Sequence, residues 1–288
     1  MKSKLSKLIV TACILIMAFG ITLAGAAEKK TIKMGVLQWN DLVCPSLVTK
    51  KTMEKFHGYD IEVVEFFEWG IAYATLAKGD VDILMSQMNF VAWDYWTRYN
   101  KRLEKLSCSS HGLNQGIVVP SYVPIDSIDE LNQHKDKFDQ KIIGIEPGAG
   151  LMRQTREVIE GYGLDFELVD GSTAAMAASV KSALAKKEWI ATIMWTPSWM
   201  TQAFDIKFLK DPKGLQQPAQ TYYWLGRKGF SEEYPVTREI MAGVFVPLED
   251  NIQMTGYIKE GLSPEKAVDR WLEENPVIQE RWMSIGEK

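Results

Sequence analysis

The chain has 288 residues, of which 46% are hydrophobic and 24% charged, and its formal net charge at pH 7 is -4. This composition is too apolar for a disordered chain, and the length suits one large domain or two medium ones. The negative charge argues against a general nucleic-acid-binding protein, because contact with phosphates requires a basic surface. Ten tryptophans are the unusual feature, and this number calls for a structural or binding role.

Residues 1–27 have the pattern of a secretory signal peptide. Lysines precede an apolar stretch that ends in the small residues Ala24-Gly25-Ala26. The stretch is short for a membrane span, so we expect cleavage and export to a periplasmic or other extracytoplasmic location. Two cysteines then remain, Cys44 and Cys108, which either pair in this oxidising location or stay buried thiols.

The next segments alternate between strand and helix patterns. Strands are predicted at residues 31–37, 59–66 and 81–85, with helices over 43–56 and 71–77 between them. This β-α-β-α-β order is typical of a parallel sheet with covering helices.

A second series of the same kind follows, and the chain then becomes mostly helical over residues 231–282. Its predicted strands are 116–120, 141–145, 166–169 and 189–195, and its predicted helices are 127–131, 151–162 and 172–187. Two α/β units in one exported chain indicate two lobes around a cleft.

Several aromatic residues fall where predicted strands end, which is the edge of a parallel sheet at which ligands bind. Aromatic faces attract cations, and a methylated ammonium ion suits them because it is weakly hydrated. We expect Trp195 and Trp199 to face a ligand. The further walls that we predict for this cage are Trp39, Trp69, Trp93 and Tyr223.

Four segments, taken together and in this order, resemble the glycine betaine-binding proteins of ATP-driven osmolyte importers. They are GIVVPSYV (116–123), IIGIEPGAG (142–150), WTPSWM (195–200) and FLKDPK (208–213). The resemblance implies an α/β, two-lobe periplasmic binding protein fold, type II-like, with a hinge and an interlobe cleft. It also implies that a quaternary ammonium ligand is held in an aromatic cage and delivered to a membrane permease with a cytoplasmic ATPase.

With this fold we expect lobe 1 to comprise residues 28–117 and 214–288, and lobe 2 residues 118–213. Trp195 matches a cage tryptophan of the family, whereas Met88 stands where many members have the cage tryptophan of the first lobe. Ser198 stands where many members have histidine. The ligand is therefore glycine betaine or a variant of it, such as choline, carnitine, proline betaine, a sulfonium analogue or an amine oxide.

An anionic tail on the ligand would need hydrogen bonds from backbone N–H groups. Two places offer them: the loop 38–42, which contains Asn40, and the helix start formed by Gly148, Ala149 and Gly150. If an acidic side chain such as Glu68 lines the pocket, the ligand is a net cation such as choline. Otherwise a zwitterion is favoured, because an unpaired buried carboxylate is costly.

Other classes of protein lack support in the sequence. The motifs G-x-S-x-G, H-E-x-x-H and G-x-x-x-x-G-K-[ST] are absent, so we predict no enzyme activity and no cofactor. The three histidines show no zinc-ligand spacing, so we predict no metal site. We expect a monomer whose partners are a small quaternary ammonium or betaine ligand and the permease, with no nucleic acid. A ligand-binding sensor of the same fold remains the alternative.

Overall fold

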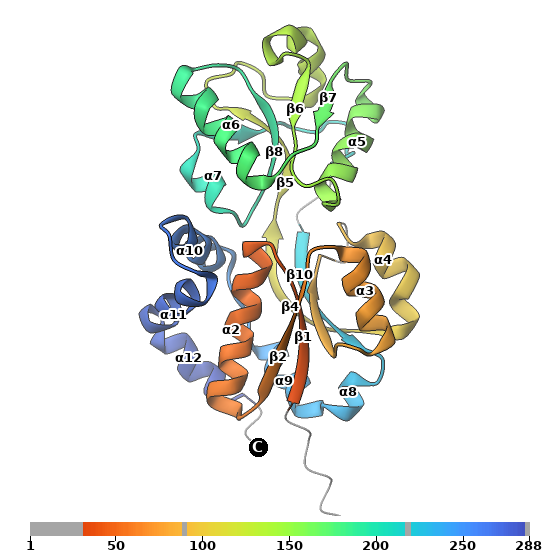
Figure 1. The fold of residues 1–288 in the computed structure, drawn as a ribbon, viewed down its shortest axis with the longest axis vertical. Coiled ribbons are helices and arrows are strands. Elements are labelled where there is room, and N and C mark those ends of the chain that lie inside the picture. The colour runs from red at the N-terminus through yellow and green to blue at the C-terminus, as the bar shows by residue number, and fades with distance from the viewer. Residues whose placement is uncertain (1–30, 88–90, 217–219, 286–288) are drawn as a thin grey trace, which may run out of the picture. The chain divides into compact units, whose positions relative to one another are not determined.

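The computed structural model describes residues 31–87, 91–216 and 220–285, and these residues form two five-stranded sheets with helices around them (Figure 1). The first sheet has the order β2-β1-β3-β10-β4. Strand β1 pairs in parallel with β2 and β3, whereas β10 runs antiparallel to β3 and β4. Its strands are β1 (Thr31–Leu37), β2 (Asp60–Phe66), β3 (Ile83–Ser86), β4 (Leu103–Leu113) and β10 (Gln220–Arg227).

The second sheet has the order β7-β6-β8-β5-β9. Strand β6 pairs in parallel with β7 and β8, and β5 runs antiparallel to β8 and β9. Its strands are β5 (Gln115–Pro120), β6 (Lys141–Ile143), β7 (Glu167–Val169), β8 (Ala191–Trp195) and β9 (Ile206–Phe208). Each sheet with its own helices is called a lobe below, the first lobe being that of the first sheet.

The first β-α-β-α-β series is confirmed. Helix α2 (Asn40–His57) connects β1 to β2, and α3 (Trp69–Lys78) connects β2 to β3. Both helices end at glycines in the left-handed conformation, Gly58 with a φ of 67° and Gly79 with a φ of 85°. Because glycine adopts this conformation without steric cost, these two positions end the helices where the sequence predicts.

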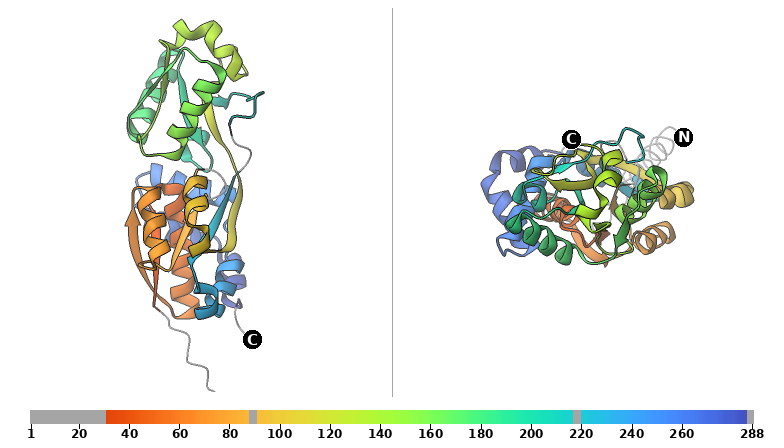
Figure 2. Two further views of the ribbon diagram at one scale, coloured as in Figure 1. Left: turned by 90° about the vertical axis from the view of Figure 1, so that its right-hand side faces the viewer. Right: turned by 90° about the horizontal axis from the view of Figure 1, so that it is seen from above.

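The second predicted β-α-β-α-β series differs from the first series at its first strand. Strand β4 leads into β5 with only Asn114 between them, so β5 enters the second sheet directly from the first (Figure 2). It lacks the preceding crossover helix that a parallel neighbour requires, and it pairs antiparallel to β8. Strand β4 itself was not predicted, because its polar sequence LEKLSCSSHGL has no apolar alternation.

The helices predicted over 151–162 and 172–187 and the mostly helical part after residue 231 are confirmed, whereas the segment predicted as a helix over 127–131 is a longer 3-10 segment, and the sequence patterns do not predict the short helices over 93–99 and 199–203. Ser172 caps α6 by accepting a hydrogen bond from the N–H of Ala175, and Ser263 caps α11 in the same way from Lys266. In the second lobe lie α5 (Gly150–Tyr162), α6 (Thr173–Lys186), α7 (Trp199–Ala203) and the 3-10 segment η2 (Ile128–Phe138). In the first lobe lie α4 (Trp93–Tyr99), the 3-10 turn η1 (Asn100–Arg102), α8 (Phe230–Glu233), α9 (Pro235–Gly243), α10 (Leu248–Lys259), α11 (Pro264–Glu274) and α12 (Pro276–Met283).

Each lobe has its own hydrophobic core. Helices α10, α11 and α12 pack against α2, and Trp271 and Trp282 are buried in the first core. Trp39 is the partly buried residue that packs against both cores.

Within the described ranges, no helix has both the length and the apolar character needed to cross a bilayer. The predicted signal peptide, residues 1–27, lies outside the described residues.

Candidate ligand-binding site

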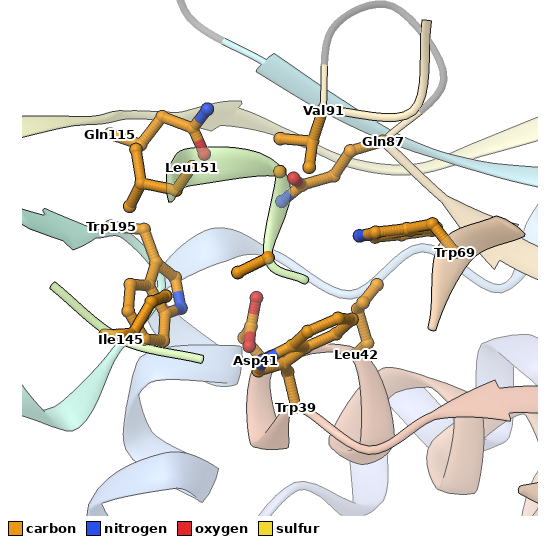
Figure 3. A pocket seen from close by; sticks show the side chains of 12 residues that line it. Trp39, Asp41, Leu42, Trp69, Gln87, Val91, Gln115, Ile145, Leu151 and Trp195 are labelled. Carbon is orange, nitrogen blue, oxygen red and sulfur yellow. The ribbon is translucent and has the colours of Figure 1, made fainter. Parts of the chain in front are cut away.

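A pocket lies where three strands end. Trp39 follows β1, Trp69 is the first residue of α3 after β2, and Trp195 ends β8 of the second sheet. All three line one pocket with about 400 Å³ of empty space, part of it open to solvent (Figure 3). Positions far apart in the sequence meet here because α/β sheets gather the residues after their strands at one edge. The other lining residues are Asp41, Leu42, Gln87, Val91, Gln115, Ile145, Ala149, Gly150 and Leu151.

The three indoles form opposing walls of this pocket. Trp39 and Trp69 are stacked, with their ring centroids 5.8 Å apart and their planes inclined by 21°. Trp195 stands on the opposite side of the pocket from Trp69 (Figure 3). Trp69 is 3% exposed and is supported by Tyr73, whose ring centroid lies 6.4 Å away. The aromatic walls of this pocket therefore come from both lobes, and aromatic faces are groups that attract cations.

A buried carboxylate, Asp41, lies between Trp39 and Trp195 (Figure 3). It belongs to the first turn of α2 and is 5% exposed. The Tyr222 hydroxyl donates to its Oδ2, and the Asn251 side-chain amide donates to its backbone oxygen at 2.8 Å. Burial raises the pKa of Asp41 from 3.8 to about 6, and hydrogen bonds from Tyr222 and Trp195 oppose this rise. A carboxylate in this environment is stabilised by a cation placed beside it.

Two buried amides give the pocket a polar end. Gln87 follows β3 and is 6% exposed, and Gln115 begins β5 and is 5% exposed. Nε2 of Gln115 donates to Oε1 of Gln154 at 3.0 Å, so α5 orients the Gln115 amide. Gln115 is also the register partner of Trp195 in the pairing of β5 with β8. A ligand hydroxyl can donate to an amide oxygen or accept from an amide nitrogen here.

The start of α5 approaches the first lobe closely. A Cβ atom on Gly150 would lie 2.0 Å from Cγ1 of Val91, and one on Gly148 would lie 2.4 Å from Oε1 of Glu68. At Gly150 the added atom would also lie 2.9 Å from the Val91 backbone oxygen, so a side chain there requires a shift of the facing segment, whereas at Gly148 the flexible Glu68 side chain could move aside. Gly150 and Leu151 are the first residues of α5 and line the pocket. Their N–H groups belong to the first turn, whose donors have no acceptor within the helix.

A second pocket, with about 990 Å³ of space that is also open to solvent, shares four residues with the first and adjoins it. Glu68 and Glu146 are among its lining residues. Glu146 is satisfied by Thr173, whose N–H and hydroxyl donate to it at 2.9 and 2.8 Å. Among the described residues that line either pocket, none carries a positive charge. The combined site is therefore acidic as well as aromatic.

The structure brings most of the predicted site residues to these two pockets. Trp39, Trp69, Trp195, Ala149 and Gly150 line the first pocket, and Asn40, Gly148, Trp199 and Ser198 line the second, which Trp39, Trp195 and Ala149 share. Trp93 does not line them and is 53% exposed. Tyr223 does not line them either, and its ring is covered by the Lys105 ammonium, 3.9 Å from the ring centroid. Met88 lies outside the described residues.

Sequence reasoning missed Asp41, Gln87 and Gln115. Asp41 follows Trp39 by two residues, and an acidic side chain directly after a buried strand was an available signal. The two glutamines carry no such signal, because only the tertiary fold turns them inward.

Of the two cysteines, Cys44 is a buried free thiol and Cys108 a half-buried one. Across residues 31–87, 91–216 and 220–285, no cluster of three or more His, Cys, Asp or Glu side chains could hold a metal ion.

Two α/β lobes with an aromatic and acidic pocket between them define a solute-binding protein. Residues 30–274 match the family described as the substrate-binding domain of ABC-type glycine betaine transport systems, and the chain belongs to this family. The fold class predicted from the sequence and the family resemblance are both confirmed.

Individual relatives agree with the family. The glycine betaine/carnitine transport binding protein GbuC of Listeria monocytogenes is 33% identical over 168 residues, which span 57% of this chain and about half (55%) of that protein. The structure is similar to lactococcal OpuAC in its closed-liganded conformation complexed with glycine betaine, with 27% identity, coverage of 88% of this chain and 99% of that one, and a TM-score of 0.81. It is also similar to the glycine betaine/L-proline-binding protein ProX of Borrelia burgdorferi, with 29% identity, coverage of 88% and 96%, and a TM-score of 0.79.

Proposed function

We propose that the protein binds a hydroxylated quaternary ammonium cation of the choline type. The observation that carries this proposal is the position of Asp41 between Trp39 and Trp195 in the first pocket. The methylated head would lie against the indoles, and each aromatic face contributes roughly 0.5–2 kcal/mol to the binding of such a cation. The carboxylate adds charge attraction, and the ligand hydroxyl would hydrogen-bond to the side-chain amide of Gln87 or Gln115, which line the same pocket.

The absence of a positive charge among the described lining residues favours a net cation over a zwitterion. A ligand carboxylate placed near Asp41 would be repelled, and both groups would lose hydration. Glu68 at the second pocket adds to the negative potential that a cation meets on entry.

Glycine betaine is the second candidate, and one feature favours it specifically. Gly150 and Leu151, the first residues of α5, line the pocket without a basic side chain, and a helix N-terminus stabilises a carboxylate. Betaine would then lie with its ammonium toward Asp41 and its carboxylate toward α5. The names of the relatives above, which refer to glycine betaine, support this candidate.

The role in transport is part of the proposal. The protein would carry its ligand to the membrane permease of an ABC transporter, as a monomer and without catalysing a reaction. Residues 1–27 would direct export to the periplasm or another extracytoplasmic site and then be removed. By residue number, lobe 1 would comprise residues 28–117 and 214–288, and lobe 2 residues 118–213, with the boundary inside β5 (Gln115–Pro120). Since a sensor could share the site, transport of labelled ligand with and without the permease distinguishes the two roles.

Titration calorimetry of the protein without residues 1–27 tests the ligand class. We expect choline to bind at least tenfold more tightly than glycine betaine, a difference of about 1.4 kcal/mol. Carnitine, proline betaine, a sulfonium analogue and an amine oxide complete the panel. Tighter binding of glycine betaine would reject the choline-type assignment, and no heat from any of these compounds would reject the function itself. Recovery of each ligand unchanged after incubation tests the absence of catalysis.

A further inference from the structure

Two charged contacts join the lobes outside the ligand pocket. The first is made by Arg153 of α5 in the second lobe. Its Nη2 donates to the backbone oxygen of Val91 at 2.9 Å and lies 3.6 Å from Oδ2 of Asp94. Val91 lies two residues before the start of α4 in the first lobe, and Asp94 lies in the first turn of that helix. Val91 also lines the ligand pocket, so this contact lies at the edge of the binding site.

The second contact involves Lys259, the last residue of α10 in the first lobe. Its Nζ lies 5.3 Å from the centroid of the Trp199 ring, and Trp199 begins α7 of the second lobe. Helices α7 and α10 pack against each other. Trp199 lines the second pocket, yet its ring contacts a cation that belongs to the protein itself. Its indole is therefore engaged between the lobes.

The two contacts lie on opposite sides of the strands that connect the lobes. Figure 1 shows α4 with α5 on one side of β4 and β5, and α7 with α10 on the other. Neither Arg153 nor Lys259 lines either pocket. Each of them spans from one lobe to the other, so opening of the cleft by rotation about the connecting strands would break one or both contacts.

We propose that Arg153 and Lys259 form a two-sided clasp that holds the lobes in the closed arrangement and so sets the rate at which ligand leaves. Both are positioning residues, because they act on the lobes and touch no ligand. This inference goes beyond the proposed function and depends on the two-lobe fold, not on the identity of the ligand.

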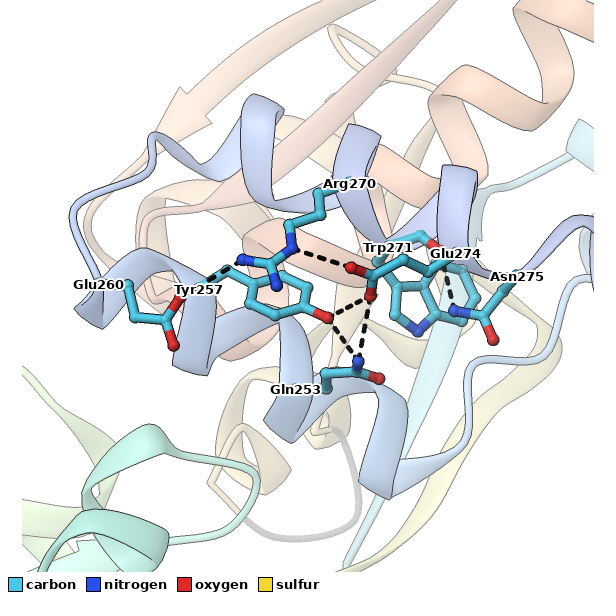
Figure 4. A network of polar contacts seen from close by, with 7 residues as sticks. All are labelled: Gln253, Tyr257, Glu260, Arg270, Trp271, Glu274 and Asn275. Atoms are coloured by element: carbon cyan, nitrogen blue, oxygen red, sulfur yellow. Dashed lines mark hydrogen bonds and ion pairs between the residues drawn. The ribbon is translucent and has the colours of Figure 1, made fainter.

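The helix that carries Lys259 is fixed to the first lobe by a separate network (Figure 4). Glu274 of α11 accepts hydrogen bonds from the Tyr257 hydroxyl of α10 and from Nε of Arg270, the latter at 2.9 Å. The Arg270 guanidinium also lies 4.0 Å from the centroid of the Tyr257 ring. Because these contacts hold α10 against α11, they fix the position of Lys259 beside the Trp199 ring relative to the first lobe.

The chain offers a matched control for each half of the clasp. Arg156 lies one turn beyond Arg153 on α5 and pairs with Asp170 at 2.9 Å within the second lobe. Lys105 of β4 makes a cation–π contact with Tyr223 of β10 within the first lobe, its Nζ 3.9 Å from the ring centroid. These controls share the chemistry of the clasp residues but do not cross between lobes.

The test compares Arg153→Gln, Lys259→Gln and the double variant with Arg156→Gln and Lys105→Gln. Stopped-flow tryptophan fluorescence with choline should show dissociation about threefold to tenfold faster for each clasp variant, the size expected for exposed ion pairs and cation–π contacts. In the double variant the two increases in dissociation rate should multiply. The association rates of all clasp variants should stay within about twofold of the parent, and the control variants should dissociate as the parent does. Dissociation rates equal to that of the parent, or equally raised in the controls, would overturn the clasp.

Small-angle X-ray scattering of the unliganded proteins supplies a readout that needs no ligand. The double variant should have a larger radius of gyration than the parent and the controls, whatever compound the site binds. Superimposable curves for parent and double variant would overturn the proposal, whereas a failure of choline to bind would count only against the proposed function. If a variant fails to fold, salt titration of the parent decides: an unchanged scattering curve between low and high salt contradicts a charged clasp.

Discussion

Replacement of Asp41 by asparagine should change stability and binding in opposite directions. The pKa of this carboxyl rises from 3.8 to about 6 on folding, and each unit corresponds to about 1.36 kcal/mol. Ionised Asp41 therefore costs the unliganded fold on the order of 3 kcal/mol above pH 6. Because the folded-state pKa is raised, the protonated Asp41 side chain makes its full contribution to the free energy of unfolding below pH 3.8. This contribution is lost as the pH rises through about 6.

Asparagine keeps an oxygen that accepts from Tyr222 while removing the charge. At about pH 8 the free energy of unfolding of Asp41→Asn should exceed that of the parent by about 1–3 kcal/mol, and the difference should vanish near pH 4. Urea denaturation at a series of pH values measures this. Asp269→Asn serves as control, since its carboxylate is 53% exposed and pairs with Lys51 on the surface.

Binding should respond in the opposite sense. Choline affinity should fall at least tenfold in Asp41→Asn at about pH 8, because the partner charge in the cage is gone. The parent should lose affinity as the pH drops below 6, whereas the variant should show a flat profile. Calorimetric titrations over the same pH range give both curves. Parallel pH profiles for parent and variant, or a variant less stable than the parent at pH 8, would refute the role assigned to this carboxylate.

Further predictions concern the walls and the entrance of the site. Trp195→Ala should weaken choline binding at least tenfold, about 1.4 kcal/mol by calorimetry, while Trp93→Ala, at an exposed position, should leave it within twofold; equal losses would remove Trp195 from the cage. Glu68→Gln should slow association a few-fold at low salt and have little effect at high salt in stopped-flow measurements, and a salt-independent change would argue against steering. Tyr222→Phe removes a hydrogen-bond donor that lowers the pKa of Asp41, so the midpoint of the binding pH profile should move upward. A downward shift would contradict this effect of the hydrogen bond on the pKa.

The sequence predicts well the features that depend on neighbouring residues. The strands and helices from β1 to β3 follow from apolar periodicity and from the glycines at positions 58 and 79, which end two helices. The caps at Ser172 and Ser263 are equally local. Strand β4 escapes this reasoning because it is held by its pairing with β10, more than a hundred residues later, and its own sequence lacks a strand pattern.

The site is predicted only in part, because burial and orientation depend on distant residues. Trp69 and Trp93 both begin helices that follow strands of the first sheet, yet one lines the pocket and the other is 53% exposed. Asp41 is held by Tyr222 and Asn251, which lie 181 and 210 residues away in the sequence. No local sequence pattern indicates these contacts. The sequence therefore predicts the tryptophans of the pocket but not Asp41.

The two ends of the pocket have opposite electrostatic character, and this decides how ligands compete. Asp41 brings a full negative charge once it is ionised, whereas the start of α5 brings the partial positive charge of a helix N-terminus, about half a unit. A zwitterion can use both ends only if it lies along the line between them, and it must then desolvate its own carboxylate. A hydroxylated cation uses the stronger end and leaves only a hydroxyl to satisfy, for which buried amides are present. The ratio of choline to glycine betaine affinity therefore measures the balance between these two ends, and neutralising Asp41 should shift that ratio toward betaine.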